Sequence, residues 1–252
     1  MRYPVIRAHG LCTHLLEDTV YTRLSKARSF EELVNILSET DYATEISQIP
    51  IHELNEDTLS RVFGKILSDR FYTMVKIASI SGENDLAYFL ENYARKIEIR
   101  NIKLILRAKH GREKVNENVL IPIPREYLMI NFSALVAAKD VFETASLLRE
   151  TTYGQILEFL EIYEKNRTIT ILEAVLDKIY YEKLLYCLRR MKGDATELNK
   201  IIRLEIDLKN LYNSVLLRKS EIPPEIIEKV VIRDGLKIKV DMLREIIRGA
   251  PD

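Results

Sequence analysis

The sequence predicts an all-α fold, and three observations lead to that prediction. Long segments place apolar side chains three and four residues apart, which is the spacing of one helical face. Glycine and proline are sparse, with 8 and 7 in 252 residues, and most fall between these segments. The best candidate for a strand is the short run VLIPIP at residues 119–124. We therefore expect helices throughout.

The first half of the chain contains three predicted helices. Ser29 followed by Glu32 has the spacing of a capping box, so the segment FEELVNIL is expected to begin a helix there. Residues 57–78 predict a helix of about 20 residues that closes near Ser81 and Gly82. Residues 85–109 predict a longer helix, because basic residues crowd its last turn, where they suit the helix dipole.

The second half of the chain repeats this layout. Residues 168–191 predict a helix that ends before Gly193, which is a helix breaker. Asp194 with Glu197 has the spacing of a second capping box. The helix that follows is expected to end near Lys219, and the proline pair Pro223–Pro224 comes a few residues later.

Three sequence landmarks occur twice at a nearly constant separation. The pairs are ETDY at 39–42 with ETTY at 150–153, EIRNI at 98–102 with DLKNL at 207–211, and ENVLI at 117–121 with EKVVI at 228–232. Matching landmarks in the same order indicate an internal repeat. We interpret residues 1–116 as a first helical module, 117–227 as a second, and 228–252 as the start of an incomplete third.

The repeated helix motif predicts a structural clasp. Asn101 and Asn210 lie in mid-helix, where asparagine competes for backbone groups, so each is expected to have a specific partner. That partner would be a neighbouring helix end or the Thr-x-Tyr turn of an adjacent module. A ligand or proton site, the alternative, would need convergent acids, and each copy has one. The motif residues are Glu98, Asn101, Arg107, Lys109, Asp207, Asn210, Arg218 and Lys219, with the turn tyrosines Tyr42 and Tyr153.

We predict no catalytic, cofactor or metal site. The Gly-Lys pair at residues 64–65 has Leu59 where a phosphate-binding loop needs its first glycine. His9 and His14 lie five residues apart, which suits surface or interface histidines better than metal ligands. The 38 basic and 38 acidic residues, with a pI near 6.9, give no basic stripe for nucleic acid.

Taken together, these motifs resemble the C subunit of archaeal and bacterial A/V-type rotary ATPases, which corresponds to the d subunit of eukaryotic V-ATPases. The resemblance rests on the doubled D/E-x-x-N-[IL]…L-R-x-K helix and on the turns in LSETDY and LRETTY. It also rests on the opening Tyr3–Arg7 and on EAVLDKIYY at residues 173–181. The matches span essentially the whole chain, in the family's order. The second copy departs from the first, because its Arg-Lys pair lies two residues further from the asparagine.

The resemblance implies a funnel-like arrangement of modules with pseudo-threefold symmetry. Such a protein would be a non-catalytic, peripheral subunit at the cytoplasmic face of the cell membrane. It would join the central shaft subunits of the rotor to the membrane proteolipid ring, without nucleic acid or cofactor. The apolar run Tyr127–Ala138 would be core between modules or, alternatively, a seat for the ring. The other functional hypothesis is a free-standing helical scaffold for protein interactions.

Overall fold

The computed structural model describes residues 2–191 and 195–249. All regular secondary structure in these two ranges is helical, which confirms the predicted all-α class. The VLIPIP run is no strand: it begins in the 3₁₀ turn Glu117–Val119 and continues as extended chain outside any sheet. Its two prolines lack the N–H donors that a strand ladder needs.

The chain divides into two compact units. The first comprises Met1–Ala87 and Asn116–Glu126, and the second comprises Tyr88–Val115 and Tyr127–Asp252. These units are defined by packing, whereas the modules 1–116, 117–227 and 228–252 are defined by repeated sequence. The modules therefore stay a prediction.

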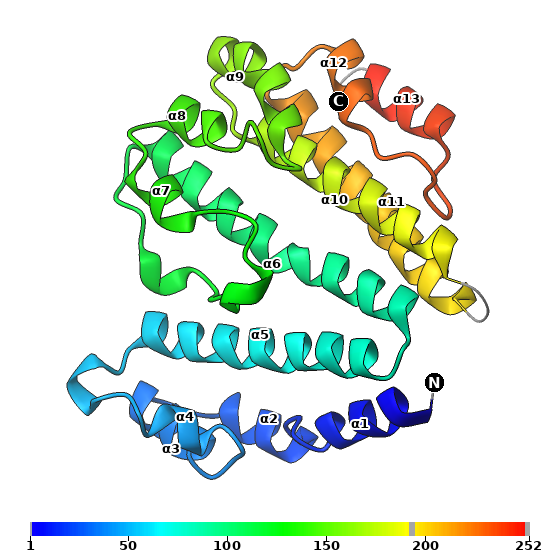
Figure 1. Ribbon diagram of the computed structural model, residues 1–252. Coiled ribbons are helices and arrows are strands. Elements are labelled where there is room, and N and C mark those ends of the chain that lie inside the picture. The colour runs from blue at the N-terminus through cyan, green and yellow to red at the C-terminus, as the bar shows by residue number, and fades with distance from the viewer. Residues whose placement is uncertain (1, 192–194, 250–252) are drawn as a thin grey trace. The chain divides into compact units, whose positions relative to one another are not determined.

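In the first unit the long helix α5 (Glu56–Ile80) is the central element (Figure 1). Helices α1 and α4 pack against it, and Leu37, Ile46 and Leu59 form a small buried cluster. The remaining elements are α1 (Arg2–Cys12), α2 (Asp18–Leu24), α3 (Phe30–Leu37), α4 (Ala43–Ile46) and the 3₁₀ helices η1 (Ile51–Glu53), η2 (Glu117–Val119) and η3 (Arg125–Tyr127).

Two caps in this unit show where the sequence prediction was right and where it was incomplete. Ser29 caps α3 by accepting a hydrogen bond from the Glu32 N–H, as expected. The Glu32 carboxylate, however, accepts from the Arg28 N–H rather than from Ser29, so the capping box is only half formed. A complete capping box starts α5, where Asn55 and Thr58 bond each other's backbone reciprocally.

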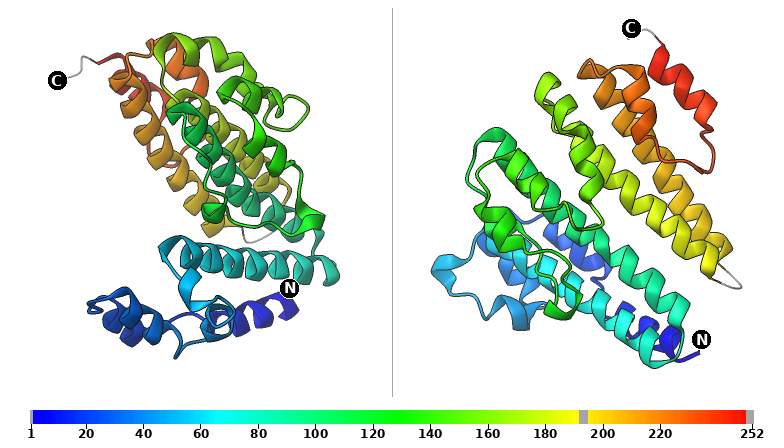
Figure 2. Two further views of the ribbon diagram at one scale, coloured as in Figure 1. Left: turned by 90° about the vertical axis from the view of Figure 1, so that its left-hand side faces the viewer. Right: turned by 45° about the horizontal axis from the view of Figure 1, so that its top comes forward.

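In the second unit the helix α10 (Thr170–Arg190) is the most deeply buried element. Leu172, Leu176 and Leu184 along it have no exposed surface. Helix α11 (Thr196–Lys219) lies along α10 and also packs against α12 and α13 (Figure 2). The remaining elements are α6 (Asn84–Gly111), whose first turn belongs to the first unit, α7 (Phe132–Ala137), α8 (Val141–Ser146), η4 (Gly154–Phe159), α9 (Leu160–Asn166), α12 (Pro224–Val230) and α13 (Val240–Arg248).

The long helices agree with the periodicity of the sequence to within a few residues. Helix α10 begins at Thr170, two residues later than expected, and α11 ends at Lys219. Gly193 and Asp194, which were expected to break one helix and cap the next, lie outside the described residues. Helix α11 begins at Thr196 after Ala195, which makes no side-chain cap.

The apolar run Tyr127–Ala138 has a mixed environment. Leu135 and Ala138 are buried, whereas Leu128 and Met129 are 41% and 57% exposed. Ile130 is buried as well, so the run contributes to the core through Ile130, Leu135 and Ala138. Over residues 2–191 and 195–249, no helix combines the length and the apolar content needed to cross a membrane.

Candidate functional site

The two Thr-x-Tyr turns fold in the same way. The Thr40 hydroxyl donates to the carbonyl three residues before it (2.6 Å) and accepts from the Tyr42 N–H (3.2 Å). Thr151 makes the same pair of bonds, to the carbonyl three residues before it (2.6 Å) and from the Tyr153 N–H (3.1 Å). Such threonine-centred turns fix the direction of the chain locally. The repeated sequence thus produces a repeated local structure.

The turn tyrosines have different neighbours. Tyr42 packs edge-on against Phe63 at 5.2 Å between ring centroids, and the Arg70 guanidinium lies over its ring. The Tyr153 hydroxyl instead donates to Glu98 Oε2 at 2.8 Å. The second turn is therefore joined to helix α6 by a buried hydrogen bond.

Glu98 lies in a buried polar cluster on α6. Its side chain is 2% exposed and accepts from Arg95 Nη1 at 3.0 Å as well as from Tyr153. Arg95 also donates to Glu91 at 3.2 Å. Burial and the adjacent carboxylate together raise the pKa of the Tyr153 hydroxyl well above its ordinary value. The hydroxyl therefore stays protonated and acts as a donor.

Asp207, the matching acid on α11, binds a loop instead of a side chain. Its buried carboxylate accepts three backbone N–H groups, from Leu236 at 3.1 Å, Lys237 at 2.6 Å and Ile238 at 3.3 Å. A Cβ at Gly235 would collide with Asp207 Oδ1. The loop approaches the helix this closely because residue 235 is a glycine.

One turn further along α11, Asn210 holds the start of the same loop. Its Nδ2 donates to the Ile232 carbonyl at 2.8 Å, and its Oδ1 accepts from the Ile232 N–H at 2.9 Å. Asp207 and Asn210 therefore fix residues 232–238 on the surface of α11. We call these two side chains, together with that segment, the α11 clasp.

The two copies of the motif are thus related but not identical. Asp207 binds backbone amides, whereas Glu98 binds a tyrosine hydroxyl and an arginine. Asn101 and Asn210 are both buried, at 2% and 3% exposure. For Asn210 the partner is Ile232, in the loop that follows helix α12.

Helices α6 and α10 are joined by two ion pairs. Arg107 forms a two-pronged pair with Glu173, at 2.5 and 2.9 Å. One turn away, Lys103 Nζ lies 2.5 Å from Asp177 Oδ1, with side-chain exposures of 13% and 9%. Since residue numbers rise along α6 while they fall along α10, the two helices run antiparallel.

Helix α11 reaches the same carboxylate from another side. Lys209 Nζ lies 3.6 Å from Asp177 Oδ2, and Asn213 Nδ2 donates to the same oxygen at 3.4 Å. Asp177 therefore contacts side chains of both neighbouring helices. Further along α10, the Tyr180 hydroxyl donates to the Tyr93 carbonyl of α6 at 3.1 Å.

A third set of contacts also joins the three helices. The Tyr181 hydroxyl of α10 donates to Glu205 Oε2 of α11 at 3.0 Å, and Lys96 of α6 pairs with that oxygen at 3.2 Å. We call the whole set the polar seam. Its members are Lys96, Lys103, Arg107, Glu173, Asp177, Tyr180, Tyr181, Glu205, Lys209 and Asn213.

The seam has the electrostatics of a structural contact. Burial lowers the pKa of Lys103, and the Asp177 charge partly opposes that effect. The hydrogen bonding to Glu173 is the main reason that the pKa of Arg107 is raised. Burial raises the pKa values of Tyr180 and Tyr181 well above that of free tyrosine. The lysine and arginine side chains of the seam are paired with its carboxylates rather than directed into an open cleft.

The basic residues at the helix ends have separate contacts. Lys109 Nζ donates to the Val136 carbonyl at 2.6 Å, and Arg218 donates to the Gly249 carbonyl at 3.0 Å. Lys219 is exposed in the last turn of α11. The structure therefore does not bring the ten predicted motif residues into one site. Arg107 belongs to the seam, and Asp207 with Asn210 belongs to the α11 clasp.

The sequence reasoning missed the centre of the seam. Glu173 and Asp177 belong to the EAVLDKIYY segment, which carries part of the family resemblance but no predicted contact. The available signal was the spacing, because acids at i and i+4 share one helical face. Tyr180 and Tyr181, three and four residues later, extend the same line of contacts.

The histidines and acids form no metal site in the described ranges. No group of three His, Cys, Asp or Glu side chains there could hold a metal ion. His9 is exposed, and the exposed His14 ring contacts Asp41 at 2.6 Å.

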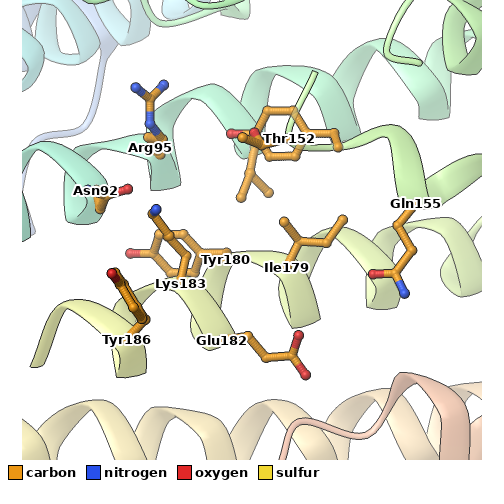
Figure 3. A pocket seen from close by; sticks show the side chains of 11 residues that line it. Asn92, Arg95, Thr152, Gln155, Ile179, Tyr180, Glu182, Lys183 and Tyr186 are labelled. Atoms are coloured by element: carbon orange, nitrogen blue, oxygen red, sulfur yellow. The ribbon is translucent and has the colours of Figure 1, made fainter. Parts of the chain in front are cut away.

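A pocket of about 420 Å³ lies beside the seam, between α6, the second turn and α10 (Figure 3). Its lining mixes tyrosine rings, aliphatic carbon and a few polar groups. The lining residues are Asn92, Arg95, Ile99, Thr152, Tyr153, Gln155, Ile179, Tyr180, Glu182, Lys183 and Tyr186.

Comparison with known proteins identifies the family. The family described as ATP synthase (C/AC39) subunit matches residues 5–252 of this chain. The chain belongs to the ATP synthase (C/AC39) subunit family. The resemblance seen in the sequence motifs is thereby confirmed.

Curated members of the ATP synthase (C/AC39) subunit family are similar to almost the whole chain. The A-type ATP synthase C subunit of Methanosarcina mazei is 26% identical over 96% of this chain and 65% of the relative. The proteins of the same name from Methanococcoides burtonii and Pyrococcus horikoshii are 24% and 27% identical, over 97% and 93% of this chain and 67% and 60% of theirs. The chain spans about two thirds of the length of the curated relatives it matches.

Proposed function

We propose that this chain is a non-catalytic central-stalk subunit of a rotary A/V-type ATPase or ATP synthase. In this role it couples the shaft subunits of the rotor to the membrane proteolipid ring. It lies peripherally at the cytoplasmic face of the cell membrane. The proposal is supported by family membership and by relatives named as the C subunit of A-type ATP synthases.

The observation that carries the mechanical part of the proposal is the polar seam. A subunit that transmits force between two partners must resist relative movement of its own helices. The seam joins three long helices by ion pairs and hydrogen bonds at successive turns. The buried pair Lys103–Asp177 is costly to separate, because a lone buried charge loses hydration without compensation.

We further propose that the repeated modules are arranged with pseudo-threefold symmetry around an axis that receives the shaft. The two identical Thr-x-Tyr turns support a repeated module. In this arrangement the predicted clasp residues orient the long helix of each module, and the chemistry of ATP belongs to other subunits.

The proposed function is tested by reconstitution. An A-type ATPase complex depleted of its own C subunit receives this chain, and ATP-driven ion uptake into vesicles is measured. We expect uptake to be restored in proportion to the chain bound, while the isolated chain hydrolyses no ATP. If this chain bound neither the shaft subunits nor the ring subunits of the depleted complex, the result would instead favour a free-standing scaffold.

A further inference from the structure

We propose that a pocket formed by the ends of α6 and α9 and the start of α8 binds a small anion with two or more phosphate groups. We call it the basic pocket. It lies wholly within the second unit and has a volume of about 770 Å³. This volume is within the range of small-molecule sites in proteins. Binding of such an anion is independent of the rotor assignment.

The walls of the basic pocket carry an excess of positive charge. The basic side chains that line it are Lys109, Arg112, Lys114, Lys139 and Arg167, and the acidic ones are Glu113 and Asp140. Five basic against two acidic side chains leave three positive charges. The whole chain has 38 basic and 38 acidic residues, so this excess is local.

The helix ends at the pocket do not cancel this excess. Helices α6 and α9 both end there, and basic residues near a helix C-terminus often serve only to balance the helix dipole. Each helix end carries about half a negative charge, so the two together still leave about two positive charges. A multiply charged anion is therefore the complementary ligand.

Four of the five basic side chains have no acidic partner. Over residues 2–191 and 195–249, the exposed side chains of Arg112, Lys114, Lys139 and Arg167 form no ion pair. Arg107, earlier on α6, is by contrast paired with Glu173. The four cations are thus accessible to a ligand. Arginine and lysine both bind phosphate, arginine through two parallel hydrogen bonds.

One wall of the basic pocket is aromatic and fixed. The Tyr163 side chain is buried, and its ring packs edge-on against His110 at 5.6 Å and Phe142 at 5.8 Å between ring centroids. His110 Nδ1 also lies 3.0 Å from the Tyr163 hydroxyl oxygen. These contacts join α6, α8 and α9, so the pocket is preformed.

The backbone fixes where two of the cations leave the chain. Arg112, directly after α6, and Arg167, directly after α9, have φ values of 56° and 51°. This left-handed conformation at a helix end is usually that of glycine or asparagine. Glycine would form either turn at lower cost, so the turns themselves do not account for two arginines.

The end of α11 separates the turn from the charge. Glu221 lies 109 residues after Arg112 and has a φ of 58°. The Arg112 and Glu221 N–H groups donate to the equivalent carbonyls of Lys109 and Arg218. The same turn therefore forms with a residue of opposite charge. Positive charge at this turn is a property of the end of α6, where the basic pocket lies.

The test is isothermal titration calorimetry of the full chain with sodium triphosphate. Inorganic phosphate, poly-glutamate and phosphatidylglycerol vesicles are the comparison ligands. The variant is Arg112→Gly with Arg167→Gly, which removes two charges and retains the left-handed turns. Glu221→Gly makes the same change of backbone at the end of α11 and is the matched control.

We expect one equivalent of triphosphate to bind, and inorganic phosphate to bind more weakly. The double glycine variant should lose affinity by at least about tenfold, because hydrogen bonds to charged groups are the stronger kind. Its urea midpoint should be unchanged or higher, since glycine suits both turns. Glu221→Gly should bind triphosphate as the wild type does. Unchanged stability excludes misfolding as the cause of lost binding.

Triphosphate that gives no saturable heat overturns the proposal, as does binding that survives in the double glycine variant. Equal affinity for poly-glutamate would identify an acidic protein as the ligand and overturn it. Binding to phosphatidylglycerol vesicles that triphosphate does not displace would identify a membrane and also overturn it. Failure of ion uptake in the reconstituted complex would refute the rotor assignment and leave the triphosphate result intact.

Discussion

Asp207 shows how one side chain can fix a whole loop. Its carboxylate accepts from three consecutive backbone N–H groups, and a charged acceptor makes each of these bonds stronger than a neutral one. The arrangement needs Gly235, because any Cβ at that position would occupy the space of the carboxylate oxygen.

Gly235→Ala should therefore lower the free energy of unfolding by about 1–3 kcal/mol, which is the usual cost of overpacking. The measurement is the urea midpoint at constant slope. Gly10→Ala is the matched control, because nothing lies within 4 Å of a Cβ there. It should be neutral or slightly stabilising, since Gly10 lies within helix α1. Equal midpoint shifts for the two variants would contradict the role given to Gly235.

Asn210 gives a second prediction, because its amide both donates to and accepts from Ile232. Asn210→Asp replaces the donor with a carboxylate oxygen that faces the Ile232 carbonyl. We expect a loss of about 2 kcal/mol of stability, the cost of an unsatisfied buried polar group. Asn199→Asp, at a partly exposed position of the same helix, should change the urea midpoint little. A wild-type midpoint for Asn210→Asp would count against the clasp.

At this scale the sequence indicated which residues matter but not what they contact. Two asparagines in mid-helix were unfavourable enough to predict specific partners, and Asn210 has one. The three amides bound by Asp207 come from a loop about 30 residues away, and no local pattern predicts that approach. Glu98 and Asp207 hold matching positions but bind different groups, because the longer Glu98 side chain meets a tyrosine and an arginine.

At the scale of elements, helix α10 depends on its contacts with the helices on both sides. Asp177 is the centre of those contacts, since it pairs with Lys103 of α6 and with Lys209 and Asn213 of α11. Removing its charge leaves the Lys103 ammonium buried without the carboxylate that it contacts.

Asp177→Asn should accordingly destabilise the protein by about 3–5 kcal/mol, the usual cost of breaking a buried ion pair on one side. The double variant Lys103→Met with Asp177→Asn should be clearly less destabilised than the sum of the single variants Lys103→Met and Asp177→Asn. A double-mutant cycle of urea midpoints measures the coupling. Additive effects would mean that the pair contributes no interaction energy. Lys200→Met, in an exposed pair with Glu197, serves as a control and should cost under about 1 kcal/mol.

The elements themselves were the most predictable part of the fold. Long helices such as α5, α6 and α11 follow from apolar periodicity, because their buried faces are continuous. Helix α10 is buried on several sides, so its sequence identifies a helix but not its central place. The capping box of α5 was missed because its third residue is Thr58 and not an acid. The seam was not predicted, since its ion pairs join residues that are 66 and 74 apart in sequence.

At the scale of the whole molecule, the buried tyrosines predict sensitivity to alkali. The pKa values of Tyr153, Tyr180 and Tyr181 are raised in the folded state, chiefly by burial. Their contribution to stability is complete below the unfolded pKa, about 10, and is lost as the pH rises toward the folded pKa. Lys103 acts in the opposite direction, because its lowered pKa means that stability rises as the pH passes the folded pKa, and the rise is complete once the unfolded lysine has also lost its proton.

The effect of the three tyrosines on stability exceeds the opposite effect of Lys103. The free energy of unfolding should therefore fall steeply above about pH 10, by up to roughly 1.4 kcal/mol per pH unit for each tyrosine. Urea midpoints at increasing pH, with tyrosinate absorbance recorded in parallel, check this. Tyr181→Phe should flatten the decline, whereas Tyr186→Phe, at a half-exposed position, should not. Ionisation of all 13 tyrosines near pH 10 without unfolding would contradict the prediction.

The antiparallel order of the seam also limits how α10 can slide along its own axis. A shift by one helical turn, about 5.4 Å, would move Asp177 from Lys103 to Arg107. Glu173 would then pass beyond Arg107, and Tyr181 would reach Lys103 and leave Glu205. That shift would therefore break the Lys103–Asp177, Arg107–Glu173 and Tyr181–Glu205 contacts together, which opposes sliding of α10 by one turn.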